Sequence, residues 1–264
     1  MNVSQPRPLL DASDATMASP VAAVAHLVPI TLADLDAAAA LQERVDRKYL
    51  LTGEQLSGLI DGLADRLAVL EIDGRRSAAY ESVYFDTQRL DSYRGAAYKR
   101  RRRFKVRTRT YLDTETTMLE VKTKGARGQT LKHRCNHEFE RRTVLGDSGR
   151  RFVGEFGELT GLSQQLLATL TTQYRRTTLA DLDDVARLTI DAGLRCTDWA
   201  DRSVTLDDRF VVETKSAGAP SVADRWLWSV GCRPETISKF GTGLAAIHPG
   251  LPSNKWHRTL VRHF

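Results

Sequence analysis

The sequence has few cysteines and no long apolar run. Its 264 residues include three cysteines, Cys135, Cys196 and Cys232, which lie far apart. No Cys-x-x-Cys pair or Cys/His cluster indicates a zinc site, and the odd number of cysteines favours reduced thiols in a cytoplasmic protein. No apolar run approaches the roughly 20 residues that cross a bilayer. Because residues 1–28 lack the basic start of a signal peptide, we expect a flexible N-terminal arm there and a single domain over residues 29–264.

Glycine-rich phosphate-binding loops are absent as well. The 18 glycines form neither a G-x-G-x-x-G motif nor a P-loop, which excludes the common dinucleotide-binding and P-loop folds. Acidic residues are the minority charge, with 33 Asp and Glu against 39 Lys and Arg, so the net charge is +6. This excess favours an anionic partner, which leaves nucleic acid, phosphate compounds and membrane surfaces open.

Extended segments with alternating polar and apolar residues dominate the chain. Such alternation is typical of β-strands, whereas apolar residues spaced three and four apart are typical of helices. We expect strands at residues 44–52, 80–87, 103–111, 116–124, 129–140, 172–180, 184–193 and 209–216. We expect helices at residues 31–42, 53–67, 161–170, 221–232 and 237–248. The pattern predicts an α+β fold of antiparallel strands with short helices.

The segment "KRRRRFKVRTRTYL", residues 99–112, concentrates positive charge on one strand face. Eight of its fourteen residues are Lys or Arg. Side chains alternate between the two faces of a strand, so Arg103, Lys105, Arg107 and Arg109 share a face. Like charges at this spacing repel one another unless water or an anion lies between them. The segment therefore indicates either a solvated face or an anion-binding site.

Single carboxylates are embedded among the cations of several predicted strands. Asp46, Glu120, Asp191 and Glu213 each share a strand face with Lys or Arg. Divalent cations prefer carboxylate oxygens, and phosphate oxygens prefer Arg and Lys, so the pattern suits a metal-plus-phosphate site. An ordinary sheet with one solvated face remains the simpler alternative. If the strands instead form a closed barrel with the charged faces inward, they line a basic tunnel whose apolar outer face needs helices as cover.

Nine short motifs, in order, resemble the VTC domain, the polyphosphate polymerase branch of the triphosphate tunnel metalloenzymes. They are "RVDRKY" (44–49), "YFDT" (84–87), "VRTRTY" (106–111), "LEVKTK" (119–124), "LKHR" (131–134), "QYRRTTL" (173–179), "ARLTID" (186–191), "FVVETKS" (210–216) and "SKFGTG" (238–243). The resemblance implies a closed antiparallel eight-stranded β-barrel with helices packed outside. It also implies a tunnel that binds ATP and polyphosphate with Mn²⁺ or Mg²⁺.

The resemblance assigns roles residue by residue. Expected catalytic residues are Lys48, Arg107, Arg109, Arg176 and Arg187. Expected substrate-binding residues are Lys122, Lys132 and Lys239, to which the shared strand faces add Lys124 and Arg134. The expected metal ligands are Glu213 and, as a supporting carboxylate, Glu120.

The expected activity is transfer of the terminal phosphoryl group of ATP to a growing polyphosphate chain. Hydrolases of the wider superfamily begin with Glu-x-Glu-x-Lys, whereas this chain reads Arg44-x-Asp46-x-Lys48, which favours transfer. The alternatives are a triphosphate hydrolase and a non-catalytic polyphosphate or inositol phosphate sensor. Nucleic acid is not expected, because carboxylates interrupt the basic face. Family members elsewhere are coupled to membrane proteins, so a separate membrane partner is an open expectation.

Overall fold

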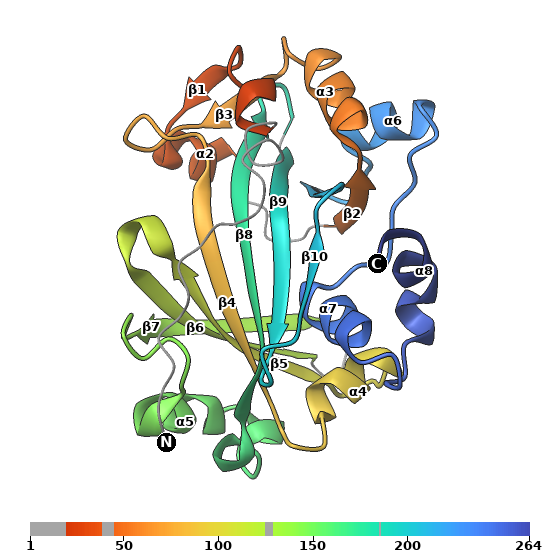
Figure 1. Ribbon diagram of the computed structural model, residues 1–264. Coiled ribbons are helices and arrows are strands. Elements are labelled where there is room, and N and C mark those ends of the chain that lie inside the picture. Colours follow the sequence, from red (N-terminus) through yellow and green to blue (C-terminus); the bar gives the residue numbers. More distant parts are fainter. Residues whose placement is uncertain (1–19, 39–44, 125–128, 185) are drawn as a thin grey trace.

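The computed structural model describes residues 20–38, 45–124, 129–184 and 186–264 (Figure 1). The strands are β1 (Val28–Ile30), β2 (Val45–Leu51), β3 (Leu67–Leu70), β4 (Ala78–Asp86), β5 (Phe104–Tyr111), β6 (Thr116–Lys124), β7 (Thr130–His137), β8 (Leu167–Asp181), β9 (Ala186–Asp198), β10 (Ser203–Leu206) and β11 (Phe210–Ser216). The helices are α2 (Leu32–Ala38), α3 (Gly53–Asp61), α4 (Asp91–Ala97), α5 (Gly146–Gly154), α6 (Val222–Ser229), α7 (Lys239–Ile247) and α8 (His257–His263), with the 3₁₀ turn η4 (Asn254–Trp256) before α8. No helix of these described ranges is long and apolar enough to span a membrane.

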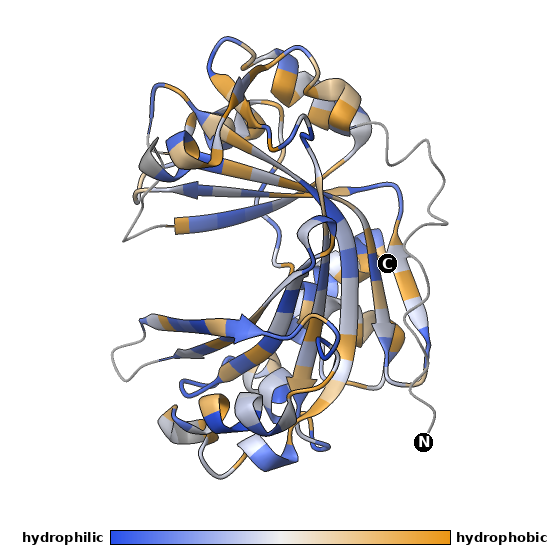
Figure 2. Cartoon of the chain, turned by 90° about the vertical axis from the view of Figure 1, so that its left-hand side faces the viewer, coloured by the Kyte–Doolittle hydropathy of each residue, from blue (hydrophilic) through white to orange (hydrophobic). Residues whose placement is uncertain are grey.

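Eight antiparallel strands form one path in the order β2-β11-β9-β8-β4-β5-β6-β7. The sheet curves strongly, and Figure 2 shows it as an open arc. The antiparallel α+β prediction is confirmed, but the closed barrel is wrong, because β2 and β7 do not pair over their described residues. Strand alternation sets the face of each side chain but does not decide whether β2 and β7, which are far apart in the sequence, meet.

The segment before β2 packs on the domain. Val24 and Leu27 are buried, and β1 pairs in parallel with β3. Arg76 donates hydrogen bonds to the carbonyls of Val24 and Ala25, both at 2.9 Å. Residues 20–28 of the predicted flexible arm therefore pack on the domain. Residues 1–19 of the arm lie outside the described part.

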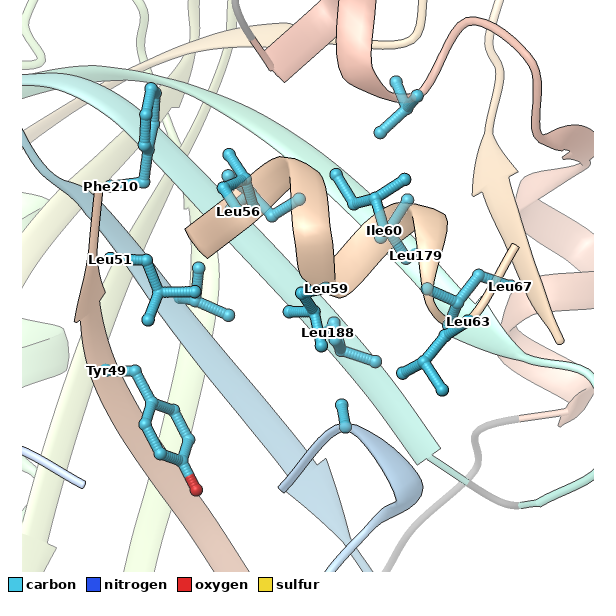
Figure 3. Close-up of a cluster of buried hydrophobic side chains, with 14 of the residues drawn as sticks. Tyr49, Leu51, Leu56, Leu59, Ile60, Leu63, Leu67, Leu179, Leu188 and Phe210 are labelled. Carbon is cyan, nitrogen blue, oxygen red and sulfur yellow. The ribbon is translucent and has the colours of Figure 1, made fainter. Parts of the chain in front are cut away.

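Helices cover the outer, convex face of the sheet in two places. Helix α3 packs Leu56, Leu59 and Ile60 against apolar side chains of β2, β8, β9 and β11, and α6 joins the same cluster (Figure 3). Thr52 and Gln55 form a capping box that fixes where α3 begins. A second cluster packs α5 on the outer face of β4, β5 and β6. These contacts remove the apolar strand faces from water, as predicted.

One helix departs from the expectation that all helices pack outside. Helix α7 lies against the concave face, where Phe240 stacks on Tyr84 with ring centroids 5.0 Å apart. An extra residue in β9 turns more apolar side chains to this face, because Gly193, at a φ of +61°, sits in a β-bulge beside Tyr174. Leu194 consequently faces α7. The concave face is thus apolar where α7 covers it and charged elsewhere.

A buried carboxylate ties the edge strand β2 to its neighbours. Asp224, at the start of α6, accepts hydrogen bonds from Tyr49 Oη and Thr214 Oγ1, both at 2.7 Å. Arg47 Nη1 lies 3.3 Å from the same carboxylate, and the Ser221 backbone N–H donates at 2.8 Å. These contacts join β2, β11 and α6, and they fix the strand that carries Lys48.

We expect Asp224→Ala to lower the free energy of unfolding by about 3–5 kcal/mol, because it leaves Arg47 without its buried partner. Thr214→Val removes a single hydrogen bond and should cost about 1 kcal/mol. Asp207→Ala, at an exposed turn, is the control and should stay within about 0.5 kcal/mol. Urea denaturation followed by circular dichroism measures all three. Equal stability of the Asp224 and Asp207 variants would contradict the role of this carboxylate.

Candidate functional site

The strand register brings the predicted strand residues to one face. Directly opposite residues of antiparallel strands share a face. The face runs across the sheet through the pairs Lys48–Glu213, Glu213–Thr189, Arg176–Asp191, Tyr80–Tyr174, Ser82–Arg109, Tyr84–Arg107, Arg107–Glu120, Glu120–Arg134, Lys122–Lys132 and Lys124–Thr130. It is the concave face, opposite the outer helix-covered clusters.

Glu120 is the first of three carboxylate hubs, a term we use for Glu120, Asp191 and Glu213. Its Oε2 accepts from Arg107 Nε at 2.7 Å, and Arg109 Nε lies 4.0 Å away. Its Oε1 lies 2.7 Å from Lys132 Nζ. Burial alone would raise the pKa of Glu120, but Arg107, Arg109 and Lys132 lower it well below its usual range. Both oxygens of Glu120 are therefore engaged by cations.

Asp191 is the second hub and lies on β9. Arg176 donates to both of its oxygens, at 2.6 and 2.8 Å, and Lys239 contacts the same carboxylate. Burial opposes ionisation, but Arg176 and Lys239 outweigh it and lower the pKa of Asp191 to about 2. Lys239 begins α7, and Ser238 caps that helix by accepting from the Gly241 N–H at 3.2 Å. The helix start thereby sets the position of Lys239.

Glu213, the third hub, has the loosest contacts. Lys215 Nζ lies 3.2 Å from one oxygen and Lys48 Nζ lies 3.9 Å from the other. Burial would raise the pKa of Glu213, yet the surrounding cations, Lys48 foremost, lower it well below its usual range. The side chain keeps 16% of its surface exposed, against 4% for Glu120 and 1% for Asp191. Glu213 is therefore the hub that an incoming ligand can reach.

Several buried polar atoms on the concave face lack a hydrogen-bond partner within the described residues: Ser82 Oγ, Arg109 Nε, Thr172 Oγ1 and Thr189 Oγ1. Ser82 lies opposite both Arg109 and Thr172, so three of these atoms belong to adjoining positions. A buried polar group without a partner costs about 1–3 kcal/mol. Groups of this kind suit a ligand rich in oxygen atoms.

Arg187 shares the face but not the centre of the site. It lies opposite Lys215, yet its guanidinium donates to Asp36 at 3.0 Å and to the Leu35 carbonyl at 3.3 Å. Both partners belong to α2, which sequence reasoning did not connect with the site. Lys124 lies at the end of β6, and Arg134 is exposed on β7.

Sequence reasoning gave several members of this face no role. Alternation put Lys105 and Lys215 on the charged faces of their strands, but neither was named as a site residue. Tyr80, Tyr84 and Tyr174 lie beneath the cations, with Arg176 above Tyr80 at 5.2 Å and Lys239 above Tyr174 at 4.5 Å. Only the register across β4 and β8 reveals that these rings line the site.

The carboxylates differ in how well they fit a divalent metal ion. In the part of the chain that the structure describes, no three His, Cys, Asp or Glu side chains gather as a ligand set. Glu120 and Asp191 are each bonded by two cations. Of the three hubs, Glu213 has the most loosely held carboxylate, which fits an ion that takes one or two protein carboxylates and completes its shell with water and substrate phosphates.

Comparison with known proteins places this geometry in a class. A putative adenylyl cyclase from Hippeastrum, described as having a dominant triphosphatase activity, has 13% sequence identity and a TM-score of 0.51, covering 84% of this chain and 100% of that one. A putative adenylate cyclase from Bacillus halodurans has 14% identity and a TM-score of 0.45, covering 74% and 93%. The Hippeastrum protein shares the fold of this chain. Residues 43–248 match the VTC domain model, so the chain belongs to the VTC domain family. A search of curated proteins returned no match.

The pH dependence of anion binding should report the lysines of this face. Burial and the charges of Arg107 and Lys48 lower the pKa of Lys105 to about 7, and burial and Arg107 do the same for Lys122. A polyanion stabilises the charged ammonium, so tripolyphosphate affinity should fall as pH rises above about 7.

The Lys105→Arg variant keeps its positive charge as the pH rises, so its affinity for tripolyphosphate should fall less steeply than that of the unmodified protein. Isothermal titration calorimetry of both proteins between about pH 6 and pH 9 at constant ionic strength measures the difference. The titration of tripolyphosphate itself affects both proteins equally. Lys122 should leave part of the pH dependence of binding in the variant. Identical slopes would contradict the assignment to Lys105.

Proposed function

We propose that this protein is an ATP-dependent polyphosphate polymerase that transfers the terminal phosphoryl group of ATP to a polyphosphate chain. The observation that carries the proposal is the convergence of Arg107, Arg109, Arg176 and Lys239 with three carboxylate hubs on one concave face. The hubs hold the guanidinium and ammonium groups in place, so little reorganisation is needed when phosphate charge arrives.

Transfer between phosphates needs alignment and charge neutralisation more than proton transfer. The acceptor is a phosphate oxygen that is already anionic at neutral pH, so no general base is required. Cations lower the pKa values of Glu120 and Asp191, which makes both weak bases, and the side chains of His133 and His137 lie on the opposite face of β7. Arg107 and Arg176 would offset charge on the transferred group, while Lys48, Lys122 and Lys132 would hold the acceptor chain.

Glu213 would hold the divalent ion, Mn²⁺ or Mg²⁺, together with phosphate oxygens of the substrate. The ion would supply charge neutralisation at the transferred phosphoryl group. Glu120, with both oxygens engaged, would instead position Arg107 and Lys132.

Triphosphate hydrolysis is the second candidate. It is favoured by the Hippeastrum protein, which has the same fold and is described as having a dominant triphosphatase activity. Incubation with ATP and Mn²⁺, followed by gel electrophoresis, separates the two. Long chains support the polymerase, free phosphate alone supports the hydrolase, and tight tripolyphosphate binding without turnover supports a sensor.

We expect Glu213→Gln to reduce polymer synthesis by about a hundredfold or more. Tripolyphosphate binding without metal should be retained or tightened, because the substitution removes a negative charge from the site. Glu54→Gln, on the exposed first turn of α3, is the matched control and should leave both unchanged. The two readouts are a synthesis assay and calorimetry. Unchanged synthesis in the Glu213 variant would contradict its role as metal ligand.

A further inference from the structure

The C-terminal segment lies beyond the family match, which ends at residue 248, yet it is built into the domain. Trp256 of η4 is 1% exposed, and its ring lies 5.5 Å from that of Tyr93 in α4. The same ring packs on Gly241 of α7, where a Cβ would collide with it. Tyr93 also donates a hydrogen bond to the Pro252 carbonyl at 3.1 Å. The segment is therefore fixed against α4 and α7.

This anchoring places Lys255 beside the start of β5. Its Nζ donates to the Ala96 carbonyl of α4 at 3.1 Å. The adjacent Gly95 lies so close to Arg103 that an added Cβ would be 3.3 Å from the Arg103 Cβ. The backbone N–H of Lys124 in turn donates to the Arg103 carbonyl at 3.0 Å. Segments distant in sequence therefore bring Lys255, Arg103 and Lys124 together.

We call Lys99, Arg103, Lys105, Lys124 and Lys255 the five-cation cluster. After burial, the strongest influences on the pKa of Lys255 are the charges of Arg103, Lys99, Lys48 and Lys124, and all lower it. The charges of Arg107 and Lys255 both lower the pKa of Lys105, so the cluster is continuous with the concave face.

The five-cation cluster contains no carboxylate hub. None of its five members forms an ion pair with an Asp or Glu within the described residues. On the concave face, by contrast, Arg107, Arg176 and Lys239 each have a carboxylate partner. Neighbouring cations without a counter-charge repel one another, and an external anion relieves this repulsion.

We propose that the five-cation cluster is a second anion subsite, which binds the part of a linear polyphosphate chain that extends beyond the phosphates held at Arg107 and Arg176. The proposal rests on the proposed function and deepens it, since it makes this protein select long chains over short ones. A chain with a charge on every repeating unit fits a cluster that is continuous with the basic face. Tripolyphosphate, held on the concave face where Lys105 lies, would not need the outer cations Lys99, Arg103 and Lys255.

Binding measurements test the proposal without turnover. Fluorescence-detected titrations with tripolyphosphate and with a long-chain polyphosphate would compare the full-length protein with Lys255→Gln, Lys255→Arg and Arg258→Gln. Arg258 is exposed on α8. Arg258→Gln is therefore a control that removes the same charge from the same segment. We expect Lys255→Gln to weaken long-chain binding about tenfold and tripolyphosphate binding less than about twofold. Lys255→Arg and Arg258→Gln should resemble the unmodified protein.

Each other outcome overturns a specific statement. Equal loss for both ligands would assign Lys255 to the inner site, and no loss for either would remove the subsite. If Arg258→Gln weakens long-chain binding as much as Lys255→Gln does, the effect is one of net charge and not of the cluster. A single-stranded oligonucleotide that binds as tightly as long-chain polyphosphate and loses as much in Lys255→Gln would replace polyphosphate as the occupant. If the unmodified protein binds neither phosphate ligand, the proposed function itself fails, which separates the two conclusions.

Discussion

Repulsion among cations on one sheet face is the constraint on which the rest of the structure depends. Strand periodicity fixes Lys105, Arg107 and Arg109 on the concave side, so the chain cannot disperse them without turning its apolar residues outward. The carboxylate hubs relieve the repulsion locally, since Glu120 and Asp191 each contact two cations closely. Positive charge still exceeds negative charge on the face, which is why we propose an anionic substrate.

The outer face supplies the stability that the concave face lacks. Two apolar clusters under α3, α6 and α5 bury one side of all the central strands, and such burial is the main favourable term in folding. The Asp224 network then secures β2, which pairs with β11 and with no other strand among the described residues. Because β2 is held from its outer face, Lys48 can remain opposite Glu213 on the inner face with only a 3.9 Å contact.

Sequence reasoning was strongest where a local rule decides the outcome. The period of two placed Lys48 and Glu213 on the charged faces of their strands, and the register puts these two residues opposite each other. It could not predict contacts between distant segments, such as those of Lys239 with Asp191 and of Arg187 with Asp36. The bulge at Gly193 and the packing of α7 inside the arc could not be predicted from the sequence either, because both depend on how the strands and the helix pack together. Closure of the barrel is a long-range property of the same kind, and its prediction was wrong.

The unequal engagement of the hubs argues for where chemistry takes place. A carboxylate closely bonded by two cations serves as a fixed counter-charge, because releasing it would leave buried charges unpaired. Glu120 and Asp191 fit this description, and they hold Arg107 and Arg176 in defined positions. Glu213 is held more loosely and is more exposed, so it can exchange a lysine contact for another cation at little cost. In the proposed reaction, the rigid hubs would orient the groups that bind phosphate, and the loose hub would leave room for the divalent ion.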